Sequence, residues 1–352
     1  MTDFDKQRTI RPWLIASVVL VFIGAIYSIL WIALAMSVQE QSVMWIKEQS
    51  NHGLNLRYEK LVASGYPFAI HLEVTSPALS VSKNAFSLDW QGESLKVTTR
   101  LWDKNRYRIE VSGKQILVFG KAKEGQKFTG DVEQALAEFV LFKGELTNVN
   151  IGLTEVQLIN YNAASEVIGI PRAELLVKKL EKPDVDVHAA SWSLSASTEN
   201  LILPWFRFSP LGTKLSLITE AHLIGKIEGD NLVRSLENWR DNGGTAELKT
   251  LKIGHGPLKV HTEGTLALDN KLQPIGALTA KLEGFYQTID ALKALSVVTA
   301  RNAITAKVLI GVLSRAPVDG GPPVLNLSIT AQNQNLYIGP IRLLKLPKVN
   351  WH

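Results

Sequence analysis

The sequence contains no cysteine among its 352 residues. This absence excludes disulfides, thiolate zinc sites, iron–sulfur clusters and cysteine nucleophiles. The chain must therefore be stable without covalent crosslinks. The absence fits an oxidising compartment, where a free thiol is a liability, and a reducing cytoplasm also permits it, so cysteine usage does not determine the location.

Motifs that carry catalytic chemistry are missing as well. There is no G-x-S-x-G turn, no phosphate-binding loop, no H-E-x-x-H helix and no dinucleotide glycine fingerprint after a strand. The carboxylates are numerous, but no spacing pairs them for glycoside hydrolysis. We therefore expect a protein that is not an enzyme and that binds no cofactor. A hydrolase with a site that the sequence does not reveal is the alternative.

The charge of the chain is only weakly basic. Lysine and arginine total 38 against 33 acidic residues, a net charge of +5. The basic residues are dispersed and lack the clustering with aromatic residues that tracking of a phosphate backbone needs. We expect no nucleic-acid partner, and at most a weak attraction to anionic lipid head groups.

One long apolar run stands near the N-terminus. From Trp13 to Met36 there are 24 consecutive uncharged residues, enough for a helix to cross a hydrocarbon core of about 30 Å. Lys6, Arg8 and Arg11 precede the run, and the positive-inside rule then leaves the N-terminus in the cytoplasm. The sequence thus predicts a single-pass inner-membrane protein whose C-terminal part lies in the periplasm.

A cleaved signal peptide is the competing interpretation of this run. Ala33-Leu34-Ala35 has the small-residue spacing that a signal peptidase requires. The apolar region of a signal peptide has about 7 to 15 residues, and this run is longer and contains aromatic residues throughout. We therefore predict an anchor, with cleavage of the N-terminal segment as the alternative.

The remaining chain has the composition of a folded protein, with 46% hydrophobic and 20% charged residues. The predicted organisation is a cytoplasmic tail over 1–12, a transmembrane helix over 13–36, a helical stalk over 37–55 and a β-rich periplasmic domain over 56–352. Two similar segments, 67–73 and 257–263, suggest two sheet-forming halves that meet near residue 200.

From about residue 56, apolar residues recur at every second position, which is typical of half-buried strands. Phe68, Ile70 and Leu72 alternate with polar residues, and short turn signals separate such runs as an antiparallel meander requires. Further strands are expected at 149–153, 185–189, 192–196, 215–223, 246–253, 258–268, 277–282 and 325–331.

Two segments have helical periodicity instead. Residues 230–240 place Leu232, Leu236 and Trp239 on one side, and a longer helix is expected over 288–315. The predicted fold class is therefore mostly β with a few helices. Either one curved antiparallel sheet or two sheets packed face to face fit the pattern, with one or two helices covering a face.

The stretch GHGPLKVHTEG at 254–264 brings His255, His261 and Glu263 close together in sequence. These residue types bind zinc or transfer protons, so the stretch is a candidate site. The alternation of Leu258 and Val260 with polar residues instead indicates a strand, on which His261 and Glu263 share the solvated face about 7 Å apart. We expect a strand and no metal site.

A second candidate for metal binding lies at 183–188, where Asp184, Asp186 and His188 project from one face of an expected strand. Carboxylates and imidazole bind divalent ions. The intervening Val185 and Val187 explain the same spacing by amphipathicity. We predict no metal here either.

The expected functional surface is the apolar face of the strands. Many amphipathic strands with few covering helices leave an apolar face that either forms a closed core or remains open as a groove for an acyl chain. The residues expected on the groove or core face are Phe68, Ile70, Leu72, Leu258, Val260, Leu266, Leu268, Leu278 and Leu282.

Several turns and strand starts accompany the helix and its stalk: Ser64-Gly-Tyr-Pro-Phe68, Asn238-Trp-Arg-Asp-Asn-Gly-Gly-Thr245, Gly264-Thr-Leu-Ala-Leu-Asp269, Ile338-Gly-Pro-Ile341, Leu346-Pro347 and Trp351. In this order they resemble the bacterial envelope proteins called domain of unknown function 2125. That family implies a fold and supplies no catalytic residues. The anchor followed by long amphipathic β-structure is also similar, more distantly, to AsmA-like envelope proteins, which implies a role with phospholipid.

Two functions from different classes follow from the sequence. The first is a periplasmic protein, anchored in the inner membrane, that binds phospholipid or another apolar ligand on its sheet in envelope maintenance. The second is a structural or assembly subunit that holds a membrane-protein partner through its sheet.

Overall fold

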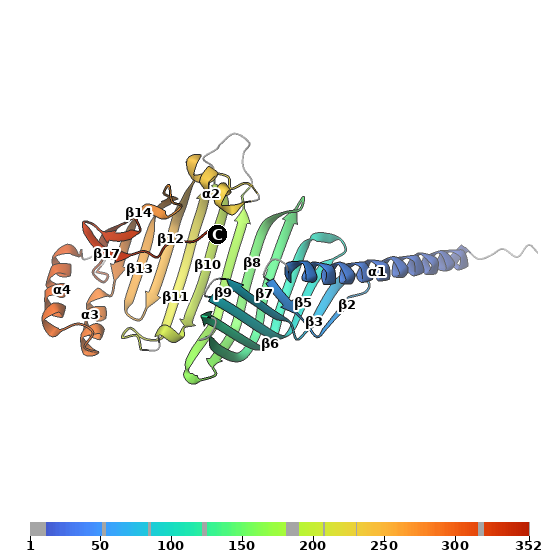
Figure 1. The fold of residues 1–352 in the computed structure, drawn as a ribbon, viewed down its shortest axis with the longest axis horizontal. Helices are drawn as coiled ribbons and strands as arrows, with labels where there is room; N and C mark the ends of the chain where they lie inside the picture. The colour runs from blue at the N-terminus through green and yellow to red at the C-terminus, as the bar shows by residue number, and fades with distance from the viewer. Residues whose placement is uncertain are drawn as a thin grey trace, which may run out of the picture.

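The computed structural model shows one long helix, one very large antiparallel sheet and a few short helices (Figure 1). It describes residues 12–50, 54–83, 86–121, 125–180, 190–206, 208–229, 231–315 and 320–351. The strand expected at 185–189 and the residues Asp184, Asp186 and His188 lie outside these ranges.

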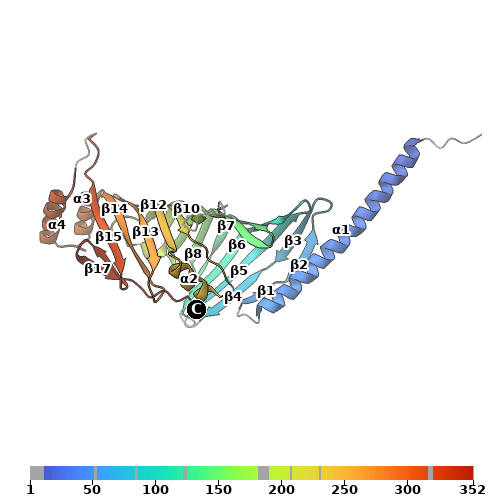
Figure 2. The ribbon, with the colours of Figure 1, turned by 90° about the horizontal axis from the view of Figure 1, so that it is seen from above.

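Helix α1 (Pro12–Ser50) runs without interruption through the predicted span and through residues 37–50 of the predicted stalk. The prediction of a helical stalk is wrong at Leu54 and Asn55, which belong to the first strand. Its long uncharged stretch, free of glycine pairs and internal proline, permits continuous i to i−4 hydrogen bonding. The segment Val19–Gln49 is long and apolar enough to cross a membrane. The C-terminal half of α1 lies against the first strands, and the N-terminal half projects beyond the sheet (Figure 2).

The described strands belong to a single 17-stranded sheet. From β5 onward each strand pairs antiparallel with the next one along the chain. The prediction of an antiparallel meander is confirmed, in its one-sheet form. The strands are β1 (Leu54–Arg57), β2 (Lys60–Ser64), β3 (Ala69–Thr75), β4 (Ala78–Lys83), β5 (Phe86–Arg100), β6 (Asp103–Lys121), β7 (Gln126–Phe142), β8 (Glu145–Asn160), β9 (Ala163–Lys179), β10 (Ala190–Ile202), β11 (Lys214–Ile224), β12 (Thr245–His255), β13 (Leu258–Leu268), β14 (Pro274–Glu283), β15 (Leu325–Gln332), β16 (Asn335–Ile338) and β17 (Ile341–Lys345).

The sheet forks at its N-terminal end, because β5 is long enough to have two partners on one side. Its C-terminal half pairs with β3, which pairs with β2, and its N-terminal half pairs with β4, which pairs with β1. Strands β5 to β9 each have 15 or more residues.

These long strands bend along one line. The register shifts between Val111 and Gly113, where Gly113 has φ 77°, and Glu155 in β8 has φ 47°. These positions are neighbours, because Gly113 pairs with Val132 and Val132 with Val156. Extra residues of this kind bend and twist a strand. The inside of the bend holds the buried cluster Phe128, Val132, Val156 and Leu158.

Helix α2 (Leu232–Asp241) confirms the first helical prediction. Asn231 caps it by accepting a hydrogen bond from the Arg234 N–H at 3.1 Å, and Trp239 is buried with its indole N–H donating to the Ile224 carbonyl at 2.6 Å. The buried Leu236 and Trp239 thus hold the β11–β12 connection against the sheet, and Leu232 is exposed.

The prediction of one helix over 288–315 is wrong. The chain forms α3 (Phe285–Ala294) and α4 (Ala300–Leu313). The break follows from Ser296, whose φ is 58°, and from Thr299, whose hydroxyl accepts a hydrogen bond from Asn302 N–H at 3.3 Å and starts a new helix. The two helices lie at the end of the sheet opposite α1 (Figure 1).

The buried cluster at the bend predicts a large stability difference between two phenylalanines of β7. Phe128 is fully buried and Phe142 is exposed. Phe128→Ala should lower the free energy of unfolding by about 3–5 kcal/mol, and Phe142→Ala by less than about 1 kcal/mol. Urea unfolding of the whole chain in mild detergent measures both. Equal losses would show that the bend does not hold the core.

Candidate functional site

The expected groove residues divide into two groups. Ile70 and Leu72 lie on β3, and Leu258, Val260, Leu266, Leu268, Leu278 and Leu282 lie on β13 and β14. Phe68 does not belong to either group, because it precedes β3 and is exposed in the β2–β3 turn. The two groups are far apart along the sheet, yet the strand register connects them.

The connection is a row of paired residues that crosses 14 strands, one residue per strand. We call it the apolar row. Each member pairs with the next in the antiparallel register, so all of their side chains point to one face. The row consists of Ile70, Thr99, Tyr107, Phe139, Val149, Val177, Leu194, Ala221, Leu248, Gly264, Leu278, Ile329, Ile338 and Ile341.

The apolar row remains largely uncovered. Ile70 is buried, and the other members are half-buried or exposed. Because the described strands form a single sheet, no second sheet packs over the row. At about 4.8 Å between strands, the row is on the order of 60 Å long. The row forms an extended apolar surface that no sequence motif predicts.

The opposite face of the same strands is polar. A second row of paired residues crosses this face from β6 to β11, and all of its members except Leu176 are polar. It consists of Arg108, Glu138, Asn150, Leu176, Ser195 and Glu220. Arg108 lies 3.0 Å from Glu110 and 4.0 Å from Glu138. The sheet is therefore amphipathic, with one polar, solvent-exposed face and one apolar face.

The stretch at 254–264 divides between the two faces. His261 and Glu263 lie on the polar face of β13, and the His261 Nε2 is 3.1 Å from the Thr250 hydroxyl. The prediction of a strand over 258–268 is confirmed. Among the described residues, no three His, Cys, Asp or Glu side chains lie close enough together to hold a metal ion.

His255 instead points to the apolar face at the end of β12, where it is buried. Its Nδ1 lies 3.0 Å from the Lys214 carbonyl, so Nδ1 carries the proton and Nε2 accepts from the Ser209 hydroxyl at 2.7 Å. The ring also contacts Phe206, with 4.8 Å between centroids. Because Ser209 in turn accepts from the Leu211 N–H at 3.2 Å, this serine–histidine pair holds the β10–β11 turn.

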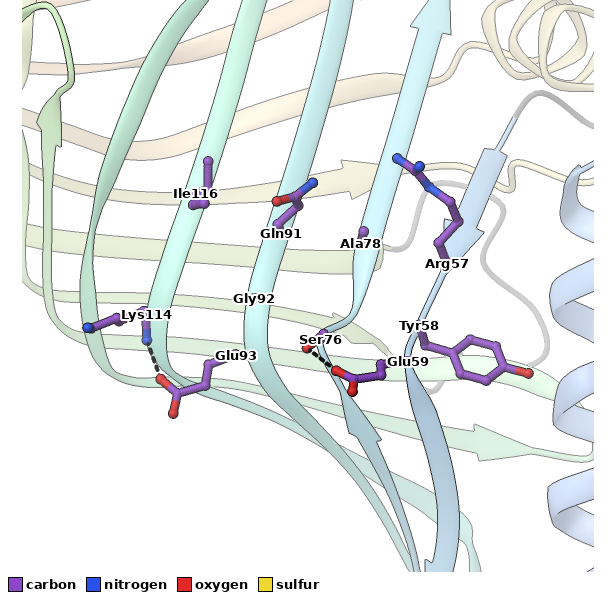
Figure 3. Close-up of a pocket in the computed structure, with 10 residues that line it drawn as sticks. All are labelled: Arg57, Tyr58, Glu59, Ser76, Ala78, Gln91, Gly92, Glu93, Lys114 and Ile116. Atoms are coloured by element: carbon purple, nitrogen blue, oxygen red, sulfur yellow. Dashed lines mark hydrogen bonds between the residues drawn. The ribbon is translucent and has the colours of Figure 1, made fainter.

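A cavity of about 630 Å³, lined by both charged and apolar side chains, lies at the fork of the sheet (Figure 3). Two of its carboxylates are engaged in local hydrogen bonds: Glu59 accepts from the Ser76 hydroxyl and Glu93 from the Lys114 N–H, both at 3.0 Å. No histidine lines the cavity. Its residues meet only because β3 and β4 diverge, so the sequence carries no signal for it.

Helix α1 is fixed to the β2–β3 hairpin near the start of the apolar row. Trp31 donates its indole N–H to the Ala69 carbonyl at 3.2 Å. Gln39 donates to the Leu61 carbonyl at 3.2 Å and accepts from the Ala63 N–H at 3.4 Å. The apolar helix and the apolar row therefore meet at one end of the sheet.

These features define a class of protein with one apolar N-terminal helix joined to a single open antiparallel sheet that has an apolar face. The chain belongs to the family described as "Uncharacterized protein conserved in bacteria (DUF2125)", whose model matches residues 31–347. The match includes all the described strands and confirms the resemblance to this family. No curated protein and no solved structure matches the chain.

His71, on the polar face of β3, predicts a pH dependence of stability. Burial and the nearby Lys96 hold its pKa below the ordinary value of 6.5, despite Glu73 and Glu110. The unfolded chain then binds the proton more readily, so stability is fully present above about pH 6.5 and falls as the pH drops towards the folded-state pKa. His71→Gln should flatten this fall.

Thermal unfolding in detergent between pH 5 and pH 8 measures the effect. The glutamine variant is a suitable control because it remains able to hydrogen-bond Thr98, whose hydroxyl lies 2.9 Å from the His71 Nδ1. An identical loss of melting temperature in both proteins would show that His71 does not contribute to the pH dependence.

Proposed function

We propose that this protein is a non-enzymatic component of the bacterial cell envelope that binds phospholipid or another apolar ligand along its apolar row. In this proposal α1 anchors the chain in the inner membrane with its N-terminus in the cytoplasm, and the sheet lies in the periplasm. The uncovered apolar row is the observation that carries the proposal.

The physical argument starts from the cost of leaving the row in water. Exposed apolar surface costs about 25 cal/mol per Å², and contiguous patches of several hundred Å² mark binding surfaces. An acyl chain bound along the row would remove its own apolar surface and that of the row from water, without requiring a specific hydrogen bond. The polar reverse face would remain solvated.

The position of α1 supports a lipid as the ligand. The row begins at Ile70, next to Ala69, which accepts the hydrogen bond from Trp31 of α1. A lipid that left the bilayer beside α1 would meet apolar side chains at once. The more distant similarity to AsmA-like proteins stays a prediction.

A matched pair of leucines tests lipid binding. Leu194 lies in the apolar row and Leu176 on the polar face of the adjacent strand, and both are exposed to a similar extent, 37% and 42%. Leu194→Lys should reduce the lipid that copurifies with the full chain at least about tenfold, because burying an ammonium group costs more than the 1.4 kcal/mol that corresponds to tenfold. Leu176→Lys should leave it unchanged.

Native mass spectrometry and lipid extraction of the full chain, purified from bacterial membranes in mild detergent, measure the bound lipid. If both variants lost the same amount of copurifying lipid, that lipid would be annular lipid around α1. A wild-type chain that is reproducibly free of lipid beyond that shell would contradict the proposal.

A second candidate function is the holding of a membrane-protein partner. It is favoured by α4, which exposes five apolar side chains to solvent at the end of the sheet opposite α1 (Figure 1). Surfaces of this kind often pack against a partner helix. The exposed side chains are Ile304, Val308, Leu309, Val312 and Leu313.

Photo-crosslinking in cells tests this candidate. A photoreactive residue at Val308 should give one discrete protein adduct, because the partner would cover the exposed side of α4. The same residue at Thr279, which is exposed on the polar face of β14, should give none. Absence of an adduct at Val308, with lipid bound to the row, would leave lipid binding as the function.

A further inference from the structure

Three aromatic residues are exposed where two hairpins end beside α1. Tyr66 and Phe68 lie in the β2–β3 turn, and Trp102 lies in the β5–β6 turn; we call these three the aromatic tip. Their exposed fractions are 53%, 64% and 67%. The turns are neighbours, because Ala69 pairs with Arg100, and the Phe68 and Trp102 rings lie 6.2 Å apart.

The aromatic tip is attached to the apolar part of α1. The Tyr66 ring meets the Trp31 ring edge-on at 5.4 Å and lies 6.3 Å from the Tyr27 ring. The Tyr66 hydroxyl lies 2.8 Å from that of Ser28. These contacts, with those of Gln39 further along, fix the depth of the tip relative to the helix.

That depth can be estimated from the helix itself. From Trp13 to Tyr27 the helix rises about 21 Å at 1.5 Å per residue. A hydrocarbon core is about 30 Å thick. If the core begins near Trp13, the contact at Trp31, at about 27 Å, lies close to its far boundary with the head groups, and the contact at Tyr27 lies about one helical turn deeper. The aromatic tip then lies at the same level.

The backbone of the turn is suited to this position. The Pro67 carbonyl accepts from the Tyr27 hydroxyl, and proline has no N–H. The Ala69 carbonyl accepts from the Trp31 indole, and the Gly65 carbonyl from the Ala69 N–H at 3.0 Å. Backbone groups that enter an apolar environment need such internal partners.

The surrounding charge matches a lipid surface. Arg100 and Lys104 flank Trp102 and are exposed. Aromatic rings prefer the boundary between hydrocarbon and head groups, and basic side chains near them attract anionic lipids. Elsewhere in water, three large exposed rings beside an apolar helix would be unfavourable.

We infer that the aromatic tip inserts into the outer boundary of the bilayer that α1 crosses, so that the sheet stands on the membrane through two hairpins as well as through the helix. This inference rests on the proposed anchoring by α1. The insertion would also place the first residue of the apolar row, Ile70, close to the membrane surface, because Ile70 lies two residues after Phe68.

The absence of native cysteine permits a direct test with single nitroxide labels. Phe68→Cys and Trp102→Cys report on the tip, and Val21→Cys reports on the span. Tyr161→Cys is the matched control, an aromatic residue 71% exposed in the β8–β9 turn at the other end of the strands. Each full-length variant is reconstituted into vesicles of phosphatidylethanolamine and phosphatidylglycerol.

Accessibility to oxygen, relative to a water-soluble nickel chelate, is read by electron paramagnetic resonance. The ratio at positions 68 and 102 should exceed that at 161 severalfold and remain below that at 21, which lies deeper in the hydrocarbon core. Equal ratios at 68, 102 and 161, with a high ratio at 21, would overturn the inference and leave the anchor intact. A low ratio at 21 would overturn the anchoring itself.

Folding of each variant is checked by its melting temperature in detergent. If Phe68→Cys is destabilised, the label at Trp102 reports on the neighbouring turn with the same expected ratio. A ratio at 102 that equals the ratio at 161 would then count against the inference in the same way.

Discussion

The antiparallel register that links each strand to its neighbour is the constraint on which the rest of the structure depends. Side chains alternate between the two faces, so a slip of one residue in any pair would turn that strand's apolar residues to the wet face. The register instead connects Ile70 beside α1 with Ile341 at the last strand through partners that, apart from Thr99, carry no polar side chain other than the Tyr107 phenol. The shape and the amphipathicity of the sheet both follow from this alignment.

A single layer of strands cannot bury a large core, and the molecule compensates locally. The long strands bend at Gly113 and Glu155, and the inside of that bend encloses Phe128 and Val132. At the far end, α3 and α4 supply Phe285 and Ala303 as further buried residues. Between these two regions the apolar face is only half-buried, and this is the part of the sheet that we propose binds lipid.

Much of the secondary structure could be predicted because its signals are local. Alternation over 258–268 and 215–223 gave strands close to those observed, and the spacing of Leu236 and Trp239 predicted α2. The break between α3 and α4 was missed, because apolar residues continue through the left-handed turn at Ser296. The great length of β5 to β9 was also missed, since their bends interrupt the period of two at positions that depend on the neighbouring strands.

The sequence by itself determined the apolar helix, the amphipathic strands and the separation of Leu258 and Val260 from His261 and Glu263, because each depends on residues adjacent in the chain. Only the tertiary structure decided that the strands form one sheet, that Phe68 belongs to an exposed turn beside Trp31, and that His255 is a buried partner of Ser209. Alternation specifies that a side chain faces one side or the other. Which residues share that side, and what covers them, depends on pairing between distant segments.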